Sequence, residues 1–161
     1  MIEVPITKEM LKKAKRKAKL LGVLRNSQLK GKGNIAGFLG EEIVLTALGG
    51  KSVNTYDYDI LIGRHKIEVK TKRCSVEPRP DYAVDIHASS AHQKCDWYIF
   101  VRVLKNYTKG WIVGKIRKED FFKKAKLLKA GTIVGSNKMK LRRDNYEMYI
   151  DDLIPVKVVK R

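Results

Sequence analysis

The sequence contains few cysteines and no long apolar run. Cys74 and Cys95 are its only cysteines, and two isolated thiols at this spacing indicate neither a disulfide framework nor a zinc module. No segment approaches the roughly 18 consecutive apolar residues of a transmembrane helix, and the amino terminus lacks the basic and then apolar pattern of a secretory signal. We therefore expect an intracellular protein with reduced thiols, in the cytoplasm, the nucleoid or the nucleus of a host, that is not secreted and does not act at a membrane.

Acidic residues are scarce relative to basic ones. The 161 residues include 35 Lys and Arg against 17 Asp and Glu, so the formal net charge is +18. A field of this size favours a polyanionic partner, of which nucleic acid is the first choice and an anionic membrane surface the second. Charge alone gives salt-sensitive binding without sequence recognition. A purely solubilising role explains the charge less well, because basic residues improve solubility less than acidic ones.

A nucleotide-binding P-loop is also absent. Residues 25–37 are rich in glycine and lysine, but they lack the Gly-Lys-Ser/Thr ending of that motif. We expect a loop here, in which Lys30 and Lys32 are candidates for contacts with nucleic-acid phosphates. The alternative is a mobile connection without a binding role.

A basic amphipathic helix is predicted over residues 7–21. Apolar residues recur at three- and four-residue steps from Met10 to Leu21, which makes one buried stripe, and lysine and arginine occupy the rest of the surface. The alternatives for this basic surface are phosphate contact, simple solvation, or attachment to a membrane, which ranks last because the stripe is narrow and lacks aromatic residues. The candidate phosphate contacts are Lys12, Lys13 and Arg16.

A second helix is predicted from Ala36 to Leu48, where Gly49 and Gly50 end it. Glu41 lies on or beside its apolar stripe. A buried carboxylate is costly without a partner, so a metal ion or a nearby lysine is expected beside it. The alternative is a glutamate at the edge of the stripe that reaches water.

The segment from Tyr58 to Thr71 has the pattern of a β-hairpin with a two-residue Gly63-Arg64 loop. This loop length places Asp59 opposite Glu68, with Lys70 on the same face. The opposite face is apolar and is predicted to be core. It is formed by Ile60, Ile62, Ile67 and Val69.

Two facing carboxylates repel each other unless they face water or flank a divalent cation. Mg²⁺ prefers oxygen ligands, and with an adjacent lysine it suits phosphate chemistry. The alternative is a solvated polar face with a Glu68–Lys70 pair. Asp57 competes with Asp59 for the metal role, and Asp59 is preferred because it opens the apolar strand and opposes Glu68.

The order of these elements resembles the PD-(D/E)XK nuclease superfamily. Gly40-Glu41 lies on a helix, Asp59 precedes an apolar strand, and Glu68-Val69-Lys70 lies on the next strand. The resemblance covers residues 36–103 and is similar in style to small Holliday-junction resolvases and small phage or viral nucleases. Tyr58 stands where the family's name motif has proline.

The resemblance implies an α/β fold with a central mixed β-sheet flanked by helices, of the restriction-endonuclease type. It also implies a Mg²⁺ site, for which Mn²⁺ would substitute, formed by Asp59, Glu68 and the Val69 carbonyl. Glu41 would hold the metal or its water, and Lys70 would orient the attacking water.

The flanking segments extend this expectation. In related nucleases a polar residue on the helix expected within 83–95 faces the site, which makes Gln93 or His92 the candidate. Lys72 and Arg73, in a loop predicted over 71–82, either contact phosphate or are simply solvated.

Beyond residue 95 we expect two antiparallel strands, a helix and a further strand. Their predicted ranges are 97–103, 111–116, 118–130 and 146–150. The whole chain, 1–161, is expected to be one nuclease domain with a basic N-terminal helix and loop (1–35), a catalytic core (36–103), and a sheet extension with a C-terminal basic helix (104–161).

The expected function is that of a Mg²⁺-dependent DNA endonuclease that is selective for branched structures such as junctions or flaps, as in DNA repair or recombination. A homodimer is expected if both strands of a junction are cut. The alternatives are a non-catalytic nucleic-acid-binding module, a restriction-type enzyme and an end-processing exonuclease.

Overall fold

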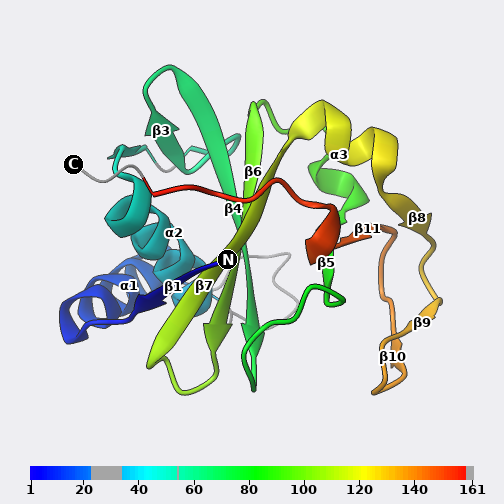
Figure 1. Cartoon of the computed structure of the whole chain (residues 1–161), viewed down its shortest axis with the longest axis horizontal. Helices are drawn as coiled ribbons and strands as arrows, with labels where there is room; N and C mark the ends of the chain where they lie inside the picture. Colours follow the sequence, from blue (N-terminus) through cyan, green and yellow to red (C-terminus); the bar gives the residue numbers. More distant parts are fainter. Residues whose placement is uncertain (23–33, 54, 159–161) are drawn as a thin grey trace.

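The computed structural model describes residues 1–22, 34–53 and 55–158, which form an α/β structure with a curled mixed sheet and three α-helices (Figure 1). The largest sheet has six strands. In order across the sheet, they are β1 (Ile2–Pro5), β7 (Lys109–Arg117), β6 (Trp97–Leu104), β4 (His65–Cys74), β3 (Ile60–Ile62) and β2 (Lys51–Ser52).

The centre of this sheet is a parallel pair of strands. β4 and β6 pair in parallel from Ile67 opposite Trp97 to Cys74 opposite Leu104, whereas the neighbouring pairs are antiparallel. Strand β6 is buried along most of its length, as expected for a strand covered on both faces. The prediction of two antiparallel strands after residue 95 is confirmed by β6 and β7.

The two-residue loop and the register of the predicted hairpin are confirmed from Ile60 onward, whereas Asp59, predicted to open the first strand, lies just before β3. Ile60 pairs with Ile67 and Ile62 pairs with His65, so the loop consists of two residues. Gly63 has φ of +59°, a conformation that favours glycine. Ile60 and Ile67 are buried in the core, which matches the face that the alternation predicts.

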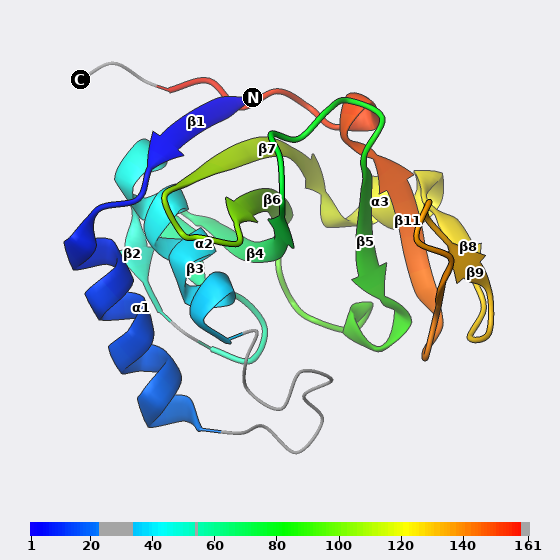
Figure 2. The ribbon, with the colours of Figure 1, turned by 90° about the horizontal axis from the view of Figure 1, so that it is seen from below.

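Helices α1 (Lys8–Leu21) and α2 (Asn34–Leu48) lie on one side of the sheet, and α1 runs alongside α2 (Figure 2). The Thr7 side chain accepts a hydrogen bond from the Met10 backbone N–H at 3.2 Å and so caps α1. Met10 is buried, but Leu21, predicted in the same stripe and the last residue of α1, is 45 % exposed. The core on this side of the sheet includes Leu39, Ile43, Val44, Val69, Ile99 and Val101.

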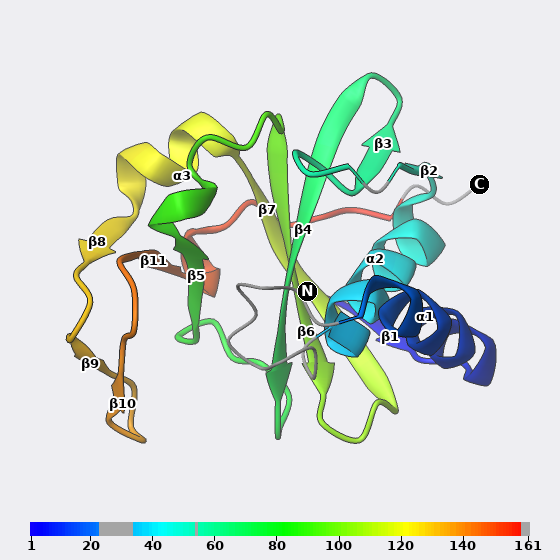
Figure 3. The same ribbon diagram turned by 180° about the vertical axis from the view of Figure 1, so that it is seen from behind.

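The other side of the sheet is covered by a second, three-stranded sheet and a short helix (Figures 1 and 3). A second core lies between the layers and includes Tyr98, Phe100, Phe121 and Met148. The covering elements are β5 (Ala83–His87), β11 (Asn145–Tyr149), β8 (Lys126–Leu128) and α3 (Lys118–Lys124). The remaining elements are η1 (Ala88–Ser90), η2 (Ile150–Asp152), β9 (Ile133–Val134) and β10 (Met139–Lys140).

Three predicted segments differ from the structure. The loop predicted from residue 71 begins only after Cys74, because β4 continues in parallel pairing with β6. The helix expected within 83–95 is strand β5 followed by one 3₁₀ turn. The basic helix predicted over 118–130 ends at Lys124, because the following residues pair with β11 as strand β8.

The amino-terminal strand was not predicted. β1 pairs antiparallel with β7, and Ile2 lies opposite Ile112, so the region 1–35, predicted as a basic helix and loop, also contributes a strand to the main sheet. In the part of the chain that the structure covers, no helix combines the length and the apolar character needed to cross a bilayer.

Candidate active site

The candidate site lies next to the part of β4 that follows Ile67, where pairing with β3 has ended. β3 pairs with β4 only over His65–Ile67, so the next residues of β4 are free of that strand. Asp59 occupies this position instead. Its Oδ2 accepts a hydrogen bond from the Val69 backbone N–H at 2.8 Å, which fixes the carboxylate beside β4.

The Asp59 carboxylate is buried and lies near the charge of Glu68. Burial and the nearby charge of Glu68 raise the pKa of Asp59 from 3.8 to about 7, against the opposing effects of the Val69 hydrogen bond and the Lys70 charge. The predicted strand pairing of Asp59 with Glu68 is not part of the β3–β4 ladder, which ends at Ile60 opposite Ile67, but the charge of Glu68 acts on Asp59. In the absence of a cation, this carboxyl group holds its proton more tightly than an ordinary aspartate.

Glu41 approaches the same place from helix α2. Its side chain is buried, with the residue 6 % exposed, and its Oε2 atom has no hydrogen-bond partner. Burial and the charge of Asp59 raise the pKa of Glu41 from 4.5 to about 8. The prediction that Glu41 lies on the inward face of its helix is confirmed, and so is the expectation of a lysine beside it.

That lysine is Lys17 of α1. Its Nζ atom lies 3.6 Å from Glu41 Oε2 and 3.2 Å from Glu42 Oε1, and it lowers the pKa of Glu41 against the larger effect of burial. Sequence reasoning did not single out Lys17. The available signal was its spacing, since it lies three residues after the buried Ala14 and thus borders the buried face of α1.

Glu68 and Lys70 form the third part of the site. Lys70 Nζ donates to Glu68 Oε1 at 2.7 Å, on the face of β4 that the alternation predicts. Gln93 joins both groups: its Nε2 donates to Glu68 Oε1 at 3.2 Å, and its Oε1 accepts from Lys70 Nζ at 3.2 Å. Gln93 is also anchored by a hydrogen bond from Nε2 to the Tyr56 carbonyl oxygen at 3.0 Å.

The structure separates the candidates that sequence left open. Gln93 is buried against Glu68 and Lys70, whereas His92 is exposed and contacts the Tyr56 hydroxyl at 3.2 Å. Asp57 accepts a hydrogen bond from the Lys94 backbone N–H at 3.0 Å. The Asp57 carboxylate therefore binds the backbone at Lys94, whereas the Asp59 carboxylate binds the backbone of β4 at Val69.

Glu41, Asp59 and Glu68 are the residues here that could hold a divalent cation. Within residues 1–22, 34–53 and 55–158, no three His, Cys, Asp or Glu side chains form a ready-made metal-binding group. Mg²⁺, however, usually keeps several waters and takes one or two carboxylates. The pKa values of Glu41 and Asp59 are raised, and Glu41 Oε2 accepts no hydrogen bond and has only the 3.6 Å ion pair with Lys17. Both observations indicate negative charge that a further cation would compensate.

The predicted phosphate contacts are distributed over two surfaces. On α1, Lys12, Lys13 and Arg16 are exposed, with Lys13 3.4 Å from Glu9. On β4, Lys72 pairs with Asp85 at 2.9 Å. Lys72 shares the face of Glu68 and Lys70, and Arg73 points to the opposite face by alternation. Lys30 and Lys32 lie outside the described residues.

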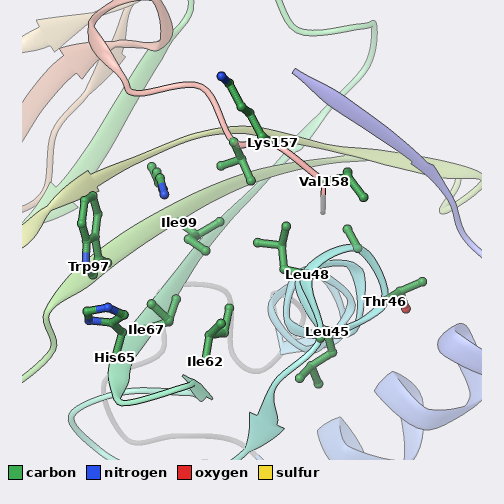
Figure 4. Close-up of a pocket in the computed structure, with 14 residues that line it drawn as sticks. Leu45, Thr46, Leu48, Ile62, His65, Ile67, Trp97, Ile99, Lys157 and Val158 are labelled. Atoms are coloured by element: carbon green, nitrogen blue, oxygen red, sulfur yellow. The ribbon is translucent and has the colours of Figure 1, made fainter. Parts of the chain in front are cut away.

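A separate groove of about 790 Å³ lies on the side of the sheet that α2 covers (Figure 4). Its walls are apolar side chains of α2, the hairpin and β6, with Trp97 at one end and Lys157 and Val158 along one side. Lys115 Nζ lies 5.0 Å from the centre of the Trp97 ring. Because the described lining residues include no carboxylate, this groove does not offer the chemistry of the Glu41–Asp59–Glu68 cluster.

Comparison of the chain with protein-family models gives no match, and a search of curated proteins gives none either.

Proposed function

We propose that the chain is a metal-dependent nuclease of the PD-(D/E)XK type that hydrolyses phosphodiester bonds in DNA. The observation that carries this proposal is the meeting of Glu41, Asp59, Glu68 and Lys70 at one edge of β4. Glu41 comes from helix α2, Asp59 directly precedes strand β3, and Glu68 and Lys70 lie on strand β4, in the chain order typical of that superfamily. The arrangement of α2 packed on an antiparallel hairpin, followed by the parallel strand β6, supports a restriction-endonuclease-like fold.

In this proposal, Asp59, Glu68 and the Val69 carbonyl hold Mg²⁺ or Mn²⁺, and Glu41 binds the metal or its water. The metal would polarise a phosphate oxygen and acidify a bound water. Lys70 supplies a positive charge and hydrogen-bond donors where negative charge develops on the phosphate, and it orients the attacking water. Gln93 holds Lys70 and Glu68 in their relative positions through its two hydrogen bonds.

The charge of +18 supports nucleic acid as the substrate, because basic residues outside the site supply affinity without base recognition. Within the nuclease class, we favour a structure-selective endonuclease for junctions, flaps or other branched DNA, in repair or recombination. Cutting both strands of a symmetric junction would require a homodimer. A restriction-type enzyme and an end-processing exonuclease are the alternatives.

One observation favours a non-catalytic nucleic-acid-binding module instead. The Lys70–Glu68 contact at 2.7 Å already neutralises one carboxylate without a metal. In a pure binding module, however, the buried carboxyl groups of Glu41 and Asp59, whose pKa values are raised, would lower stability without contributing to phosphate binding.

The deciding experiment is cleavage of a labelled DNA panel in Mg²⁺, in Mn²⁺ and in EDTA. The panel contains a four-way junction, a flap, a linear duplex and a single strand, and the proteins are wild type, Lys70→Ala and the control Lys66→Ala. Lys66 is an exposed lysine on the same strand, so its loss changes charge without removing the Glu68 contact.

We expect metal-dependent cleavage that is reduced roughly 10²–10⁴-fold in Lys70→Ala and little changed in Lys66→Ala. DNA binding in EDTA should be similar for all three proteins. Salt-sensitive binding without cleavage of any substrate in either metal would reject the nuclease in favour of the binding module. Full cleavage by Lys70→Ala would reject the role of Lys70.

A further inference from the structure

A second pocket, of about 340 Å³, adjoins the candidate site and shares Lys70 with it. Side chains of β4, β5 and β6 line it, together with Ser90. Its polar lining includes Lys72 and Arg102, which are direct neighbours in the parallel β4–β6 pairing and therefore lie on the same face of the sheet. Two like charges at this spacing repel each other unless an anion lies between or above them.

Arg102 is the unusual member of this pocket. The residue is only 6 % exposed, and its Nη2 atom donates to the Ala83 carbonyl oxygen. No ion pair in the described part of the chain includes Arg102, although fully buried arginines are almost always paired. A guanidinium has five N–H donors, so most of its hydrogen-bonding capacity is unused.

The nearby carboxylates form no direct ion pair with Arg102, although the charge of Asp85 acts on it and opposes the lowering of the Arg102 pKa by burial. Asp85 lies in the lining, but it pairs with Lys72 at 2.9 Å, and Glu147 lies opposite Asp85 on β11. The Nδ1 atom of His87, another lining residue, is buried and has no hydrogen-bond partner. The pocket therefore contains a buried guanidinium without a direct ion pair and a ring nitrogen that can donate in one tautomer, and both suit an anionic ligand with several oxygens.

We propose that this pocket binds a phosphate group of the nucleic-acid substrate, held by Arg102 with support from Lys72 and His87. The proposal rests on the proposed nuclease function and adds to it a phosphate subsite next to Lys70. A planar guanidinium matches two phosphate oxygens at once, and the volume accommodates a phosphate with part of its sugar. The phosphate is either a strand-terminal monoester or an internal diester.

The test measures binding in EDTA, where cleavage plays no part. Wild type is compared with Arg102→Met, which retains a long apolar side chain, and with Arg142→Met, which removes the same charge from an exposed site. The probes are inorganic phosphate against chloride at equal ionic strength, read as a shift in melting temperature, and three labelled duplexes, read by anisotropy. The duplexes carry 5′-phosphates, carry 5′-hydroxyls, or are closed at both ends by hairpins.

We expect phosphate to raise the melting temperature of wild type and Arg142→Met but not of Arg102→Met. We also expect Arg102→Met to weaken DNA binding roughly 10–100-fold, the range for a hydrogen bond to a charged group. A loss confined to the 5′-phosphorylated duplex identifies a terminal monoester, and an equal loss on all three duplexes identifies an internal diester. Unchanged binding of phosphate and of every duplex by Arg102→Met overturns the proposal.

If Arg102→Met does not fold, the wild-type protein supplies the answer. Phosphate titration is followed through the arginine Nε–Hε and histidine ring NMR signals, and saturable shifts of Arg102 and His87 are expected. Their absence at high phosphate concentration overturns the subsite. Phosphate binding in EDTA by a protein that never cleaves DNA would instead reject only the nuclease function, so the two failures are distinguishable.

Discussion

Gly40 of α2 packs directly on Thr71 of β4: a methyl group on Gly40 would lie 1.9 Å from Thr71 Oγ1. The next residue along the helix is Glu41, and the strand carries Lys70 just before Thr71. This contact therefore sets how closely the helical and the strand-borne parts of the candidate site approach each other. Because Gly40 has no side chain, α2 can pack close enough to β4 to bring Glu41 to the site.

The first prediction concerns this contact. Gly40→Ala should destabilise the protein by about 1–3 kcal/mol through overpacking and should reduce any metal-dependent cleavage by moving Glu41. Gly37→Ala on the same helix meets nothing within 4 Å, and it should be neutral or stabilising by up to about 1 kcal/mol. Urea unfolding and cleavage assays measure both effects. Adding Thr71→Ala to Gly40→Ala should restore most of the stability, and equal stability of the two glycine variants would contradict the packing argument.

The second prediction concerns pH. The unfolded chain has ordinary carboxyl pKa values of 4.5 and 3.8 at Glu41 and Asp59, whereas the folded values are about 8 and about 7. Between these limits the folded protein binds more protons than the unfolded chain, so its free energy of unfolding should fall as pH rises from about 4 to about 8, by a few kcal/mol. Chemical unfolding in EDTA across this range measures the slope.

Two controls accompany the pH series. Glu41→Gln should flatten the slope, while Glu9→Gln, at an exposed position on α1, should leave it unchanged. Mg²⁺ at pH 8.5 should raise the melting temperature of wild type more than that of Glu41→Gln. A wild-type stability that rises between pH 5 and 8 would contradict the uncompensated charge at this site.

The third prediction concerns Lys17. Its replacement by methionine removes the cation near Glu41 and should lower stability by about 1–2 kcal/mol. The loss should be larger at pH 8.5, where Glu41 is ionised, than at pH 6. The matched control is Lys13→Met, which breaks a solvent-exposed pair with Glu9 and should change stability by less than about 0.5 kcal/mol. Lys17 Nζ also lies 5.7 Å from the centre of the Phe38 ring. A pH-independent effect of Lys17→Met would therefore assign its contribution to the Glu42 ion pair or to this ring contact.

The fourth prediction concerns Gln93 as a positioning residue. Gln93→Leu removes the hydrogen bonds to Glu68 and Lys70, and it should slow single-turnover cleavage roughly 10–100-fold and shift its pH profile, with DNA affinity unchanged. His92→Leu, at the adjacent exposed residue, should have little effect. Loss of affinity without a change in the pH profile would indicate that Gln93 only stabilises the fold.

The hairpin and the first two helices were predictable because their determinants are local. The period-2 alternation, the positive φ required at Gly63, and the three- and four-residue spacing in α1 and α2 depend only on residues near one another in sequence. The same local patterns placed Glu68 and Lys70 on one face of β4 and Glu41 on the buried face of α2. Strands β1 and β8, by contrast, form by pairing with β7 and β11. These partners are distant in the sequence, so local patterns do not reveal the pairing.

The sequence by itself determined the charge, the hairpin register and the order of the candidate site residues. Tertiary structure alone decided which polar groups meet. Lys17 is one of many lysines on α1, and only the packing of α1 on α2 brings it to Glu41; Arg102 is one residue in an apolar run, and only the layer containing β5 buries it without an ionic partner. Local periodicity fixes the direction in which a side chain points, but the contact it makes depends on segments distant in the sequence.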